Sequence, residues 1–259
     1  MEIKQIEEPI NNLQEVFYEA GKLSIELRNK GLTKHIKKDR TPVTNGDIEV
    51  NNILLNNLKK ITPNIPIVSE ETVDLTKKNT HKIFWLIDPI DGTKEYIAGK
   101  DEYTLNAALV IDKIPSIGLV AAPKKKQLFY SYGKGDSYLI ENNSTKKNEC
   151  KKHTPKGEVI AVSSAPRPSD IILNELKKYN VTSIVKMASS YKFCVIASGK
   201  FDIYAAKERA HEWDYAAGHA VAEHAGAIIK TLDGKPFYYG KEDLKNPSIL
   251  MRRSENLND

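Results

Sequence analysis

The sequence predicts a layered α/β protein, and three observations support that prediction. Near the N-terminus, apolar residues recur at helical spacing in two stretches. Between residues 104 and 140, four short stretches rich in β-forming residues follow one another, which is typical of antiparallel strands. From residue 159 onward, expected strands and helices alternate, and such alternation favours helices packed against a sheet.

The first half of the chain is expected to begin with two amphipathic helices. One covers residues 9–28, and the second runs from about Val50 to Ile61, where Pro63 ends it. The basic, turn-rich segment between them, residues 31–46, is expected to be a loop. Strands are expected at residues 66–69, 83–87, 104–111, 116–122, 127–132 and 137–140, with a helical turn at residues 93–98.

A polar stretch of low complexity, residues 141–149, is expected to be an exposed hairpin or loop near a domain boundary. We therefore divide the chain into an N-terminal α+β region, residues 1–150, and a C-terminal α/β region, residues 151–259. In the second region, strands are expected at residues 159–163, 183–187 and 201–204, and helices at residues 168–179, 189–198 and 214–225.

Composition places the chain among ordinary globular proteins, with 259 residues, 40% hydrophobic and 28% charged. No apolar run is long enough to span a bilayer, and the charged N-terminus does not resemble a secretory signal. Cys150 and Cys194 are too few for a disulfide framework, so we expect a reducing cytoplasm. The net charge of +5 would help to attract an anionic substrate, and no motif of a nucleic-acid-binding module is visible.

The segment from Trp85 to Thr93 is the most informative part of the chain. Asp88 and Asp91 follow an apolar run, and a Gly-Thr pair comes directly after them. Carboxylates bind hard cations such as Mg²⁺, while the N–H groups that begin a helix attract phosphate. The alternative is a turn, because Asp91-Gly92 is also typical of hairpins, and this segment alone leaves both interpretations open.

Further acids stand at the ends of other expected elements. Glu70 and Glu71 end the strand before the Asp-x-x-Asp segment, so the edge of a sheet could bring them close to Asp88. Asp47 and Asp214 each begin an expected helix and could simply be N-caps. Taken singly, each acid has this ordinary explanation. Together they form the assembly of carboxylates that metal-assisted chemistry on a phosphate ester requires.

Four blocks of the sequence resemble one known family. They are Pro42-Val-Thr44 with Asp47, Ser69-Glu70-Glu71, Asp88-Pro-Ile-Asp91-Gly-Thr93, and Trp213-Asp214 with Ala217-Gly218. In order and spacing they resemble the inositol monophosphatase superfamily of lithium-sensitive, Mg²⁺-dependent phosphatases, over nearly the whole chain. The resemblance implies a five-layered α-β-α-β-α sandwich.

Within that superfamily, the chain most resembles the cysteine-pathway 3′(2′),5′-bisphosphate nucleotidases. Residues 93–109, 189–194 and 213–222 carry this closer likeness. Those enzymes remove the 3′-phosphate of adenosine 3′,5′-bisphosphate, a by-product of sulfate activation and transfer, and leave AMP. Three alternatives remain open: an inositol or other sugar phosphatase, a fructose 1,6-bisphosphatase, and a non-catalytic nucleotide- or RNA-associated binding protein. The last is least favoured because every expected metal ligand is present.

The resemblance also implies roles for individual residues. Two or three Mg²⁺ ions would be held by Glu70, Asp88, Asp91, Asp214 and the carbonyl of Ile90. Thr93 and Asp47 would orient and deprotonate the attacking water, with Glu71 assisting. The substrate would contact the residues of this site and a further basic group, namely Glu70, Ile90, Asp91, Gly92, Thr93, Ser189, Lys192, Lys207, Arg209 and Asp214.

One position departs from the pattern of these nucleotidases. They usually carry an arginine two residues after the tyrosine that matches Tyr204, where it helps to bind the 5′-phosphate, and this chain has Ala206 there. Either Lys207 or Arg209 could take over that role. We expect a small phosphorylated substrate as the partner and no nucleic acid. The sequence leaves a homodimer and peripheral membrane association open.

Overall fold

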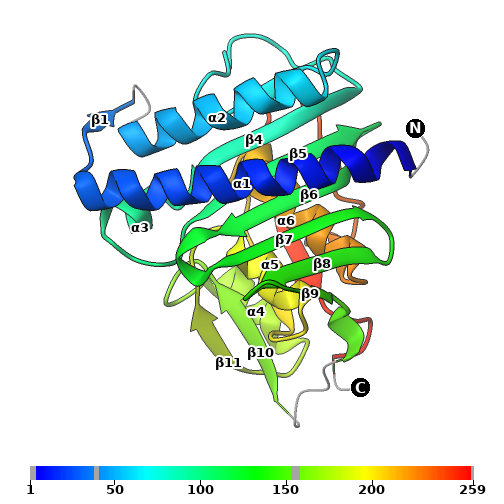
Figure 1. The fold of residues 1–259 in the computed structure, drawn as a ribbon. Helices are drawn as coiled ribbons and strands as arrows, with labels where there is room; N and C mark the ends of the chain where they lie inside the picture. Colours follow the sequence, from blue (N-terminus) through cyan, green and yellow to red (C-terminus); the bar gives the residue numbers. More distant parts are fainter. Residues whose placement is uncertain (1–3, 38–40, 153–157, 258–259) are drawn as a thin grey trace.

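The chain folds into five layers in the order α-β-α-β-α, which confirms the predicted fold class (Figure 1). The structure is a computed structural model and describes residues 4–37, 41–152 and 158–257. Parts of the expected loop at residues 31–46 therefore lie outside the described residues. Two sheets form the β layers, and helices cover both outer faces and fill the space between the sheets.

The first layer consists of α1 (Lys4–Lys30) and α2 (Asn45–Ile61), which run side by side across one face of the larger sheet (Figure 1). Their apolar positions, including Leu13, Phe17 and Leu54, are buried in one cluster with residues of that sheet. Helical spacing thus identified both helices correctly. The loop expected between them contains a short hairpin of β1 (Lys34–Ile36) and β2 (Pro42–Thr44), whose three-residue strands are too short to give a periodic signal.

The second layer is a seven-stranded sheet in the order β3-β4-β5-β6-β7-β8-β9. β3 pairs with β4 in parallel, and every later neighbour pair is antiparallel, as the expected meander predicts. The polar segment near residue 145 forms an exposed hairpin, also as expected. The strands are β3 (Ile67–Ser69), β4 (Ile83–Asp91), β5 (Thr104–Ile111), β6 (Ile114–Ala122), β7 (Gln127–Gly133), β8 (Asp136–Glu141) and β9 (Ser144–Lys147).

The fourth layer is a five-stranded sheet in the order β11-β10-β12-β14-β13. Its members are β10 (Val159–Ser163), β11 (Val181–Lys186), β12 (Ile203–Ala206), β13 (Ile228–Lys230) and β14 (Ile249–Arg252). The first three match the expected strands. β13 and β14, of three and four residues, were not anticipated.

The third layer holds α5 (Tyr191–Ala197) and α6 (Glu212–His224) between the two sheets. One buried cluster joins side chains of both sheets to these helices. The fifth layer is α4 (Asp170–Lys177), which packs on the outer face of the smaller sheet through Ile172 and Leu176. The two sheets fall on either side of residue 150, and the cluster around α5 and α6 contains side chains from both regions of the chain.

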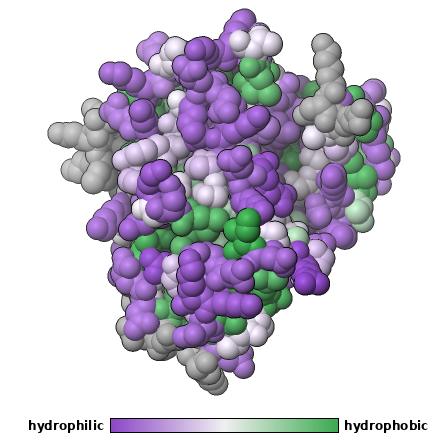
Figure 2. All heavy atoms as spheres, turned by 180° about the vertical axis from the view of Figure 1, so that it is seen from behind, coloured by the Kyte–Doolittle hydropathy of each residue, from purple (hydrophilic) through white to green (hydrophobic). Residues whose placement is uncertain are grey.

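Hydrophilic residues dominate the face opposite to that of Figure 1, and a smaller hydrophobic area interrupts them (Figure 2). Within the described part of the chain, no helix combines the length and the apolar character that crossing a membrane requires. The long helix α1 is amphipathic, with alternating buried and exposed positions from Ile10 onward.

Candidate metal and phosphate site

Three carboxylates from three different elements meet at the edge of the larger sheet. Ser69 pairs with Ile87 across the parallel strands β3 and β4, and the Glu70 N–H donates to the Ile87 carbonyl at 3.1 Å. Glu70 therefore lies beside Asp88, and the first turn of α6 adds Asp214. Oxygen atoms of Glu70, Asp88 and Asp214 all lie within 4.8 Å of one another.

The environment of this cluster favours a bound cation. Asp88 is 1% exposed, and its Oδ1 atom has no hydrogen-bond partner among the described residues. Burial and the neighbouring acids raise the pKa of Asp88 well above its ordinary value, and burial raises the pKa of Asp214 to about 8, with Asp91 and Glu70 adding to the shift. Crowded, desolvated carboxylates with one orphaned oxygen fit a hard cation such as Mg²⁺, and no His or Cys in the described part of the chain belongs to the cluster.

Asp91 lies next to this cluster and is held by residues that the sequence analysis did not single out. The register of β4 and β5 shifts between Asp88 and Asp91, so the strand bends within the motif. The Ser190 N–H donates to Asp91 Oδ2 at 2.5 Å, and the Ser190 hydroxyl donates to Asn106 Oδ1. Burial raises the pKa of Asp91 to about 6, although Lys192 and the Ser190 N–H oppose that shift. Ser190 and Asn106 carry no motif signal of their own, because only the hydrogen bond that joins the residue before α5 to β5 gives them a role.

Thr93 and Asp47 lie together, as their expected shared role requires. Thr93 Oγ1 lies 3.2 Å from Asp47 Oδ1 and 3.1 Å from the Ile90 carbonyl oxygen. The other carboxylate oxygen of Asp47 accepts hydrogen bonds from the Thr44 N–H and hydroxyl, at 2.7 and 2.6 Å. Burial raises the pKa of Asp47, which these hydrogen bonds oppose. Asp47 is thus the third residue of a capping box, and the N-cap of α2 is Thr44.

Asp214 has the same local arrangement. Its Oδ2 atom accepts the His211 N–H at 2.8 Å, so His211 is the N-cap of α6 and Asp214 is the third residue of the helix. The expectation that Asp47 or Asp214 could itself be the N-cap is therefore wrong by three positions in each case. One oxygen of each carboxylate is committed to the helix start, while the other faces the site.

The hairpin interpretation of Asp91-Gly92 is also wrong. Gly92 has a φ of 90° and leads directly from β4 into the short helix α3 (Thr93–Ile97). A Cβ atom at this position would lie 3.2 Å from the Glu102 carbonyl oxygen, so the left-handed conformation and the close approach both favour glycine. Thr93 begins α3, and the first N–H groups of a helix have no partner within it.

Lys37 is a site residue that the sequence analysis missed. Its Nζ atom lies 3.0 Å from Glu70 Oε1 and 2.8 Å from Glu71 Oε1. Burial alone would lower the pKa of Lys37, but the two carboxylates raise it. Burial raises the pKa of Glu71 to about 7, with Lys37 opposing that shift. Only its place in a basic segment marked Lys37, and that segment looked like an ordinary solvated loop.

A cavity of about 240 Å³ adjoins the acids and contains most of the expected substrate-binding side chains. Asp91, Gly92, Ser189, Lys192, Arg209 and Asp214 line it, together with Ser164, Tyr204 and Tyr215. Lys192 is 5% exposed, and its Nζ atom donates to the Ser189 carbonyl. Ser189 does not belong to a helix as expected, since it has a left-handed φ of 55° and α5 begins at Tyr191. Lys207 is exposed and is not among the residues that line the cavity.

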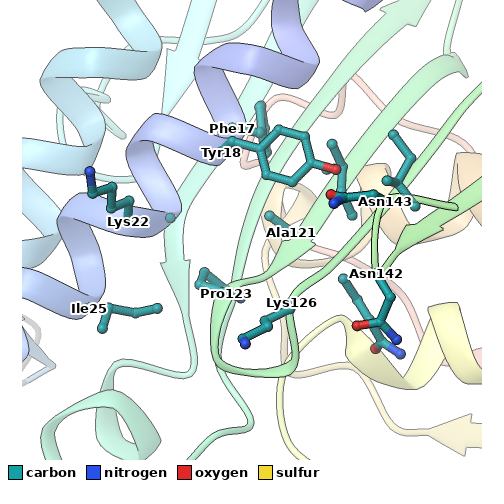
Figure 3. A pocket seen from close by; sticks show the side chains of 13 residues that line it. Phe17, Tyr18, Lys22, Ile25, Ala121, Pro123, Lys126, Asn142 and Asn143 are labelled. Atoms are coloured by element: carbon teal, nitrogen blue, oxygen red, sulfur yellow. The ribbon is translucent and has the colours of Figure 1, made fainter.

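A larger hollow of about 470 Å³ lies elsewhere on the molecule. Figure 3 shows Phe17, Tyr18, Lys22 and Ile25 of α1 on one side of it and Pro123 and Lys126 on the other. Among the described residues, no carboxylate and none of the expected site residues lines it. Chemistry thus assigns the smaller, polar cavity to the candidate site.

Comparison with known proteins agrees with this fold. The chain belongs to the inositol monophosphatase family, whose model matches residues 6–257. The membership predicted from the four sequence blocks is therefore confirmed.

Several relatives carry the same name. The 3′(2′),5′-bisphosphate nucleotidase CysQ of Escherichia coli K12 is 36% identical over 215 residues, which cover 82% of this chain and 86% of that protein. The protein of that name from Buchnera aphidicola is 36% identical over 225 residues, 85% of this chain and 83% of its own length. The crystal structure of CysQ from Bacteroides thetaiotaomicron, described as a bacterial member of the inositol monophosphatase family, superimposes with a TM-score of 0.79 at 28% identity and covers 95% of this chain and 98% of its own.

Proposed function

We propose that the chain is a Mg²⁺-dependent 3′(2′),5′-bisphosphate nucleotidase that removes the 3′-phosphate of adenosine 3′,5′-bisphosphate and leaves AMP. The reaction would recycle a by-product of sulfate activation and transfer. The single observation that carries the proposal is the meeting of Glu70, Asp88 and Asp214, with their oxygens within 4.8 Å, beside a cavity that also contains Lys192 and Arg209. Carboxylates suited to cations and basic side chains suited to anions thus lie beside the same cavity.

The acids would hold the metal and the Thr93–Asp47 pair would prepare the water. Glu70, Asp88, Asp91 and Asp214, with the Ile90 carbonyl, are the proposed ligands of two or three ions. When bound, Mg²⁺ would lower the pKa of a water and offset negative charge on the phosphoryl oxygens. Thr93 Oγ1 lies within hydrogen-bond distance of both Asp47 and the Ile90 carbonyl. Thr93 would therefore orient the attacking water, and Asp47 would accept the proton that the water loses.

The remaining residues would hold the substrate and the acids in place. The N–H groups of Gly92 and Thr93 are proposed to contact the phosphate that is cleaved, together with Glu70 and the other metal ligands. Glu71 would act indirectly, because Lys37 bridges it to Glu70 and so fixes the position of that ligand. Ser189 and Lys192 would bind the remainder of the substrate from the start of α5.

The proposal is tested by measuring phosphate release from adenosine 3′,5′-bisphosphate, myo-inositol 1-phosphate and fructose 1,6-bisphosphate, each with Mg²⁺ and with EDTA. We expect the nucleotide to have the highest kcat/KM, activity to vanish in EDTA, and Li⁺ or excess Ca²⁺ to inhibit. Full activity in EDTA would contradict metal-assisted chemistry. A higher kcat/KM for inositol phosphate would replace the nucleotidase with a general phosphatase of the same family.

A further inference from the structure

Three positively charged side chains line the candidate cavity, each from a different element. Lys94 belongs to α3 and is exposed. Lys192 belongs to α5 and is almost fully buried, while Arg209 lies in the loop between β12 and α6 and is exposed. Burial lowers the pKa of Lys192 to about 8, and Arg209 contributes to that shift, so the two charges are close enough to repel each other. An anion placed between them would relieve this repulsion.

In the described part of the chain, a hydrogen bond, and not an ion pair with an acid, holds the side chain of Arg209 in place. Its Nη1 atom donates to Ser164 Oγ at 2.7 Å, in the segment that follows β10. Among the residues that the structure describes, no carboxylate oxygen is found within 4.0 Å of its guanidinium group. Guanidinium groups bind phosphate with two parallel hydrogen bonds, so an unneutralised arginine at a cavity wall is suited to a phosphate ester.

The geometry of β12 explains why a positive charge at this side of the cavity comes from Arg209, in the loop after β12, and not from the strand itself. Alternate residues of a strand share a face, and Tyr204 and Ala206 belong to the cluster next to α5, while Ile203 and Ala205 belong to the cluster next to α4. A long side chain at position 206 would therefore share the side of the sheet on which Tyr204 lines the cavity. Ala206 provides no charge there, and of the two bases that follow, only Arg209 lines the cavity.

We infer that Arg209 determines specificity by binding the phosphate group that is not cleaved, with Ser164 orienting its guanidinium group and Lys192 contacting the same anion. The inference rests on the proposed function, because it concerns the second phosphate of the same substrate. It assigns preference for a bisphosphorylated nucleotide to a loop residue and not to strand β12.

The test compares Arg209→Ala with the unmodified enzyme on adenosine 3′,5′-bisphosphate and on adenosine 3′-monophosphate, which lacks the second phosphate. We expect kcat/KM for the bisphosphate to fall roughly ten- to a hundredfold, mainly through KM, because a charge-assisted contact is lost. The monophosphate should be hydrolysed as before. Arg167→Ala is the matched control, because Arg167 is also exposed but does not line this cavity.

Product inhibition gives a second measurement, which does not depend on the hydrolysis of adenosine 3′-monophosphate. AMP carries only the phosphate that remains, so its inhibition constant should rise in Arg209→Ala, while that of inorganic phosphate should not change. Arg209→Lys should recover part of the loss, and Ser164→Ala should raise KM for the bisphosphate without lowering kcat.

Two outcomes overturn the inference while leaving the proposed function intact. One is that Arg209→Ala keeps the preference for the bisphosphate or loses both substrates equally. The other is that Lys207→Ala, and not Arg209→Ala, removes the preference. If the unmodified enzyme shows no preference for the bisphosphate, both the nucleotidase assignment and the role of Arg209 fail.

Discussion

At the scale of single residues, the site depends on buried carboxylates that would repel one another without a cation. Asp88 is the extreme case, since it is almost completely buried, has an orphaned oxygen and lies beside two other acids. Such a residue lowers stability, because desolvation and like charge both disfavour its ionised form, and we propose that it is kept for its role in binding metal. Substitutions that remove the charge should therefore separate activity from folding.

Asp88→Asn and Asp91→Asn should each abolish turnover with little change in the fold. Without metal, the melting temperature of Asp88→Asn should equal or exceed that of the unmodified protein, because the substitution removes one charge from a repulsive cluster. Steady-state kinetics and thermal unfolding in EDTA provide the two measurements. A melting temperature that falls in step with activity would instead identify these acids as structural.

Thr93→Ala and Asp47→Asn should lower kcat much more than they change KM. Their side chains contact each other and are proposed to act on the attacking water, so their contribution belongs to the transition state. Asp47→Asn keeps an oxygen that can accept the hydrogen bonds of Thr44, so α2 should remain capped, which circular dichroism can check. A change confined to KM would move both residues from catalysis to substrate binding.

At the scale of elements, the position of α6 decides whether Asp214 reaches the other acids. α6 crosses β6 closely: a Cβ atom added at Gly118 would lie 2.4 Å from the Ala217 carbonyl oxygen and 2.8 Å from the Ala220 Cβ atom. On the other side of α6, a Cβ atom at Gly218 would lie 2.7 Å from the Phe193 Cβ atom. Small residues on both sides thus allow the helix to fit between the two sheets.

Gly118→Ala should destabilise the protein by about 1–3 kcal/mol, because the helix backbone must move to admit the methyl group. The same displacement should lower kcat, since α6 carries Asp214 at its first turn. Gly133→Ala is the matched control in the same sheet, where the nearest atom, Asp136 Oδ2, lies 4.0 Å from the added Cβ. Urea unfolding gives the comparison, and equal stability of the two variants would show that the crossing is not tight.

At the scale of the whole molecule, the free energy of unfolding depends on pH, because several carboxyl groups at one site have raised pKa values. Burial raises the pKa of Asp214 to about 8 and that of Glu71 to about 7, above the ordinary values of 3.8 and 4.5. The folded protein therefore favours their protonated forms. This contribution to the free energy of unfolding is complete below about pH 4 and is lost as the pH rises through 7 and 8.

Metal-free protein should accordingly lose stability between about pH 5 and pH 8. Lys192 does not alter that window, because burial lowers its pKa only to about 8 and its effect appears above that pH. Burial lowers the pKa of His224 to about 4, which opposes the loss below about pH 6.5, so the loss should be steepest between about pH 6.5 and pH 8. Saturating Mg²⁺ should flatten or reverse the slope, since a bound cation favours the ionised acids. Thermal unfolding in EDTA and in Mg²⁺ across this range measures both effects. A metal-free melting temperature that rises from pH 5 to pH 8 would contradict the assignment of these shifts.

Local sequence patterns were sufficient where one element decides the outcome. The spacing of apolar residues predicted α1 and α2, the succession of short stretches rich in β-forming residues predicted the meander from β5 to β8, and the four motif blocks predicted the family. The acids of the site stood out because carboxylates rarely cluster at the ends of apolar runs without a function. Each helix, strand or motif block is recognised within one short stretch of residues, so the local sequence contains the signal.

Contacts between distant segments decided the rest. Lys37 on Glu70 and Glu71, Ser190 on Asp91, and Arg209 on Ser164 each join residues that are far apart along the chain, and nothing local predicts such pairs. β13 and β14 form only because a sheet edge is available to receive them. The sequence by itself thus determined the chemistry of the site, since residue type and order specify it. The tertiary structure determined which basic group stands beside that chemistry, because the folding of separate layers brings those atoms together.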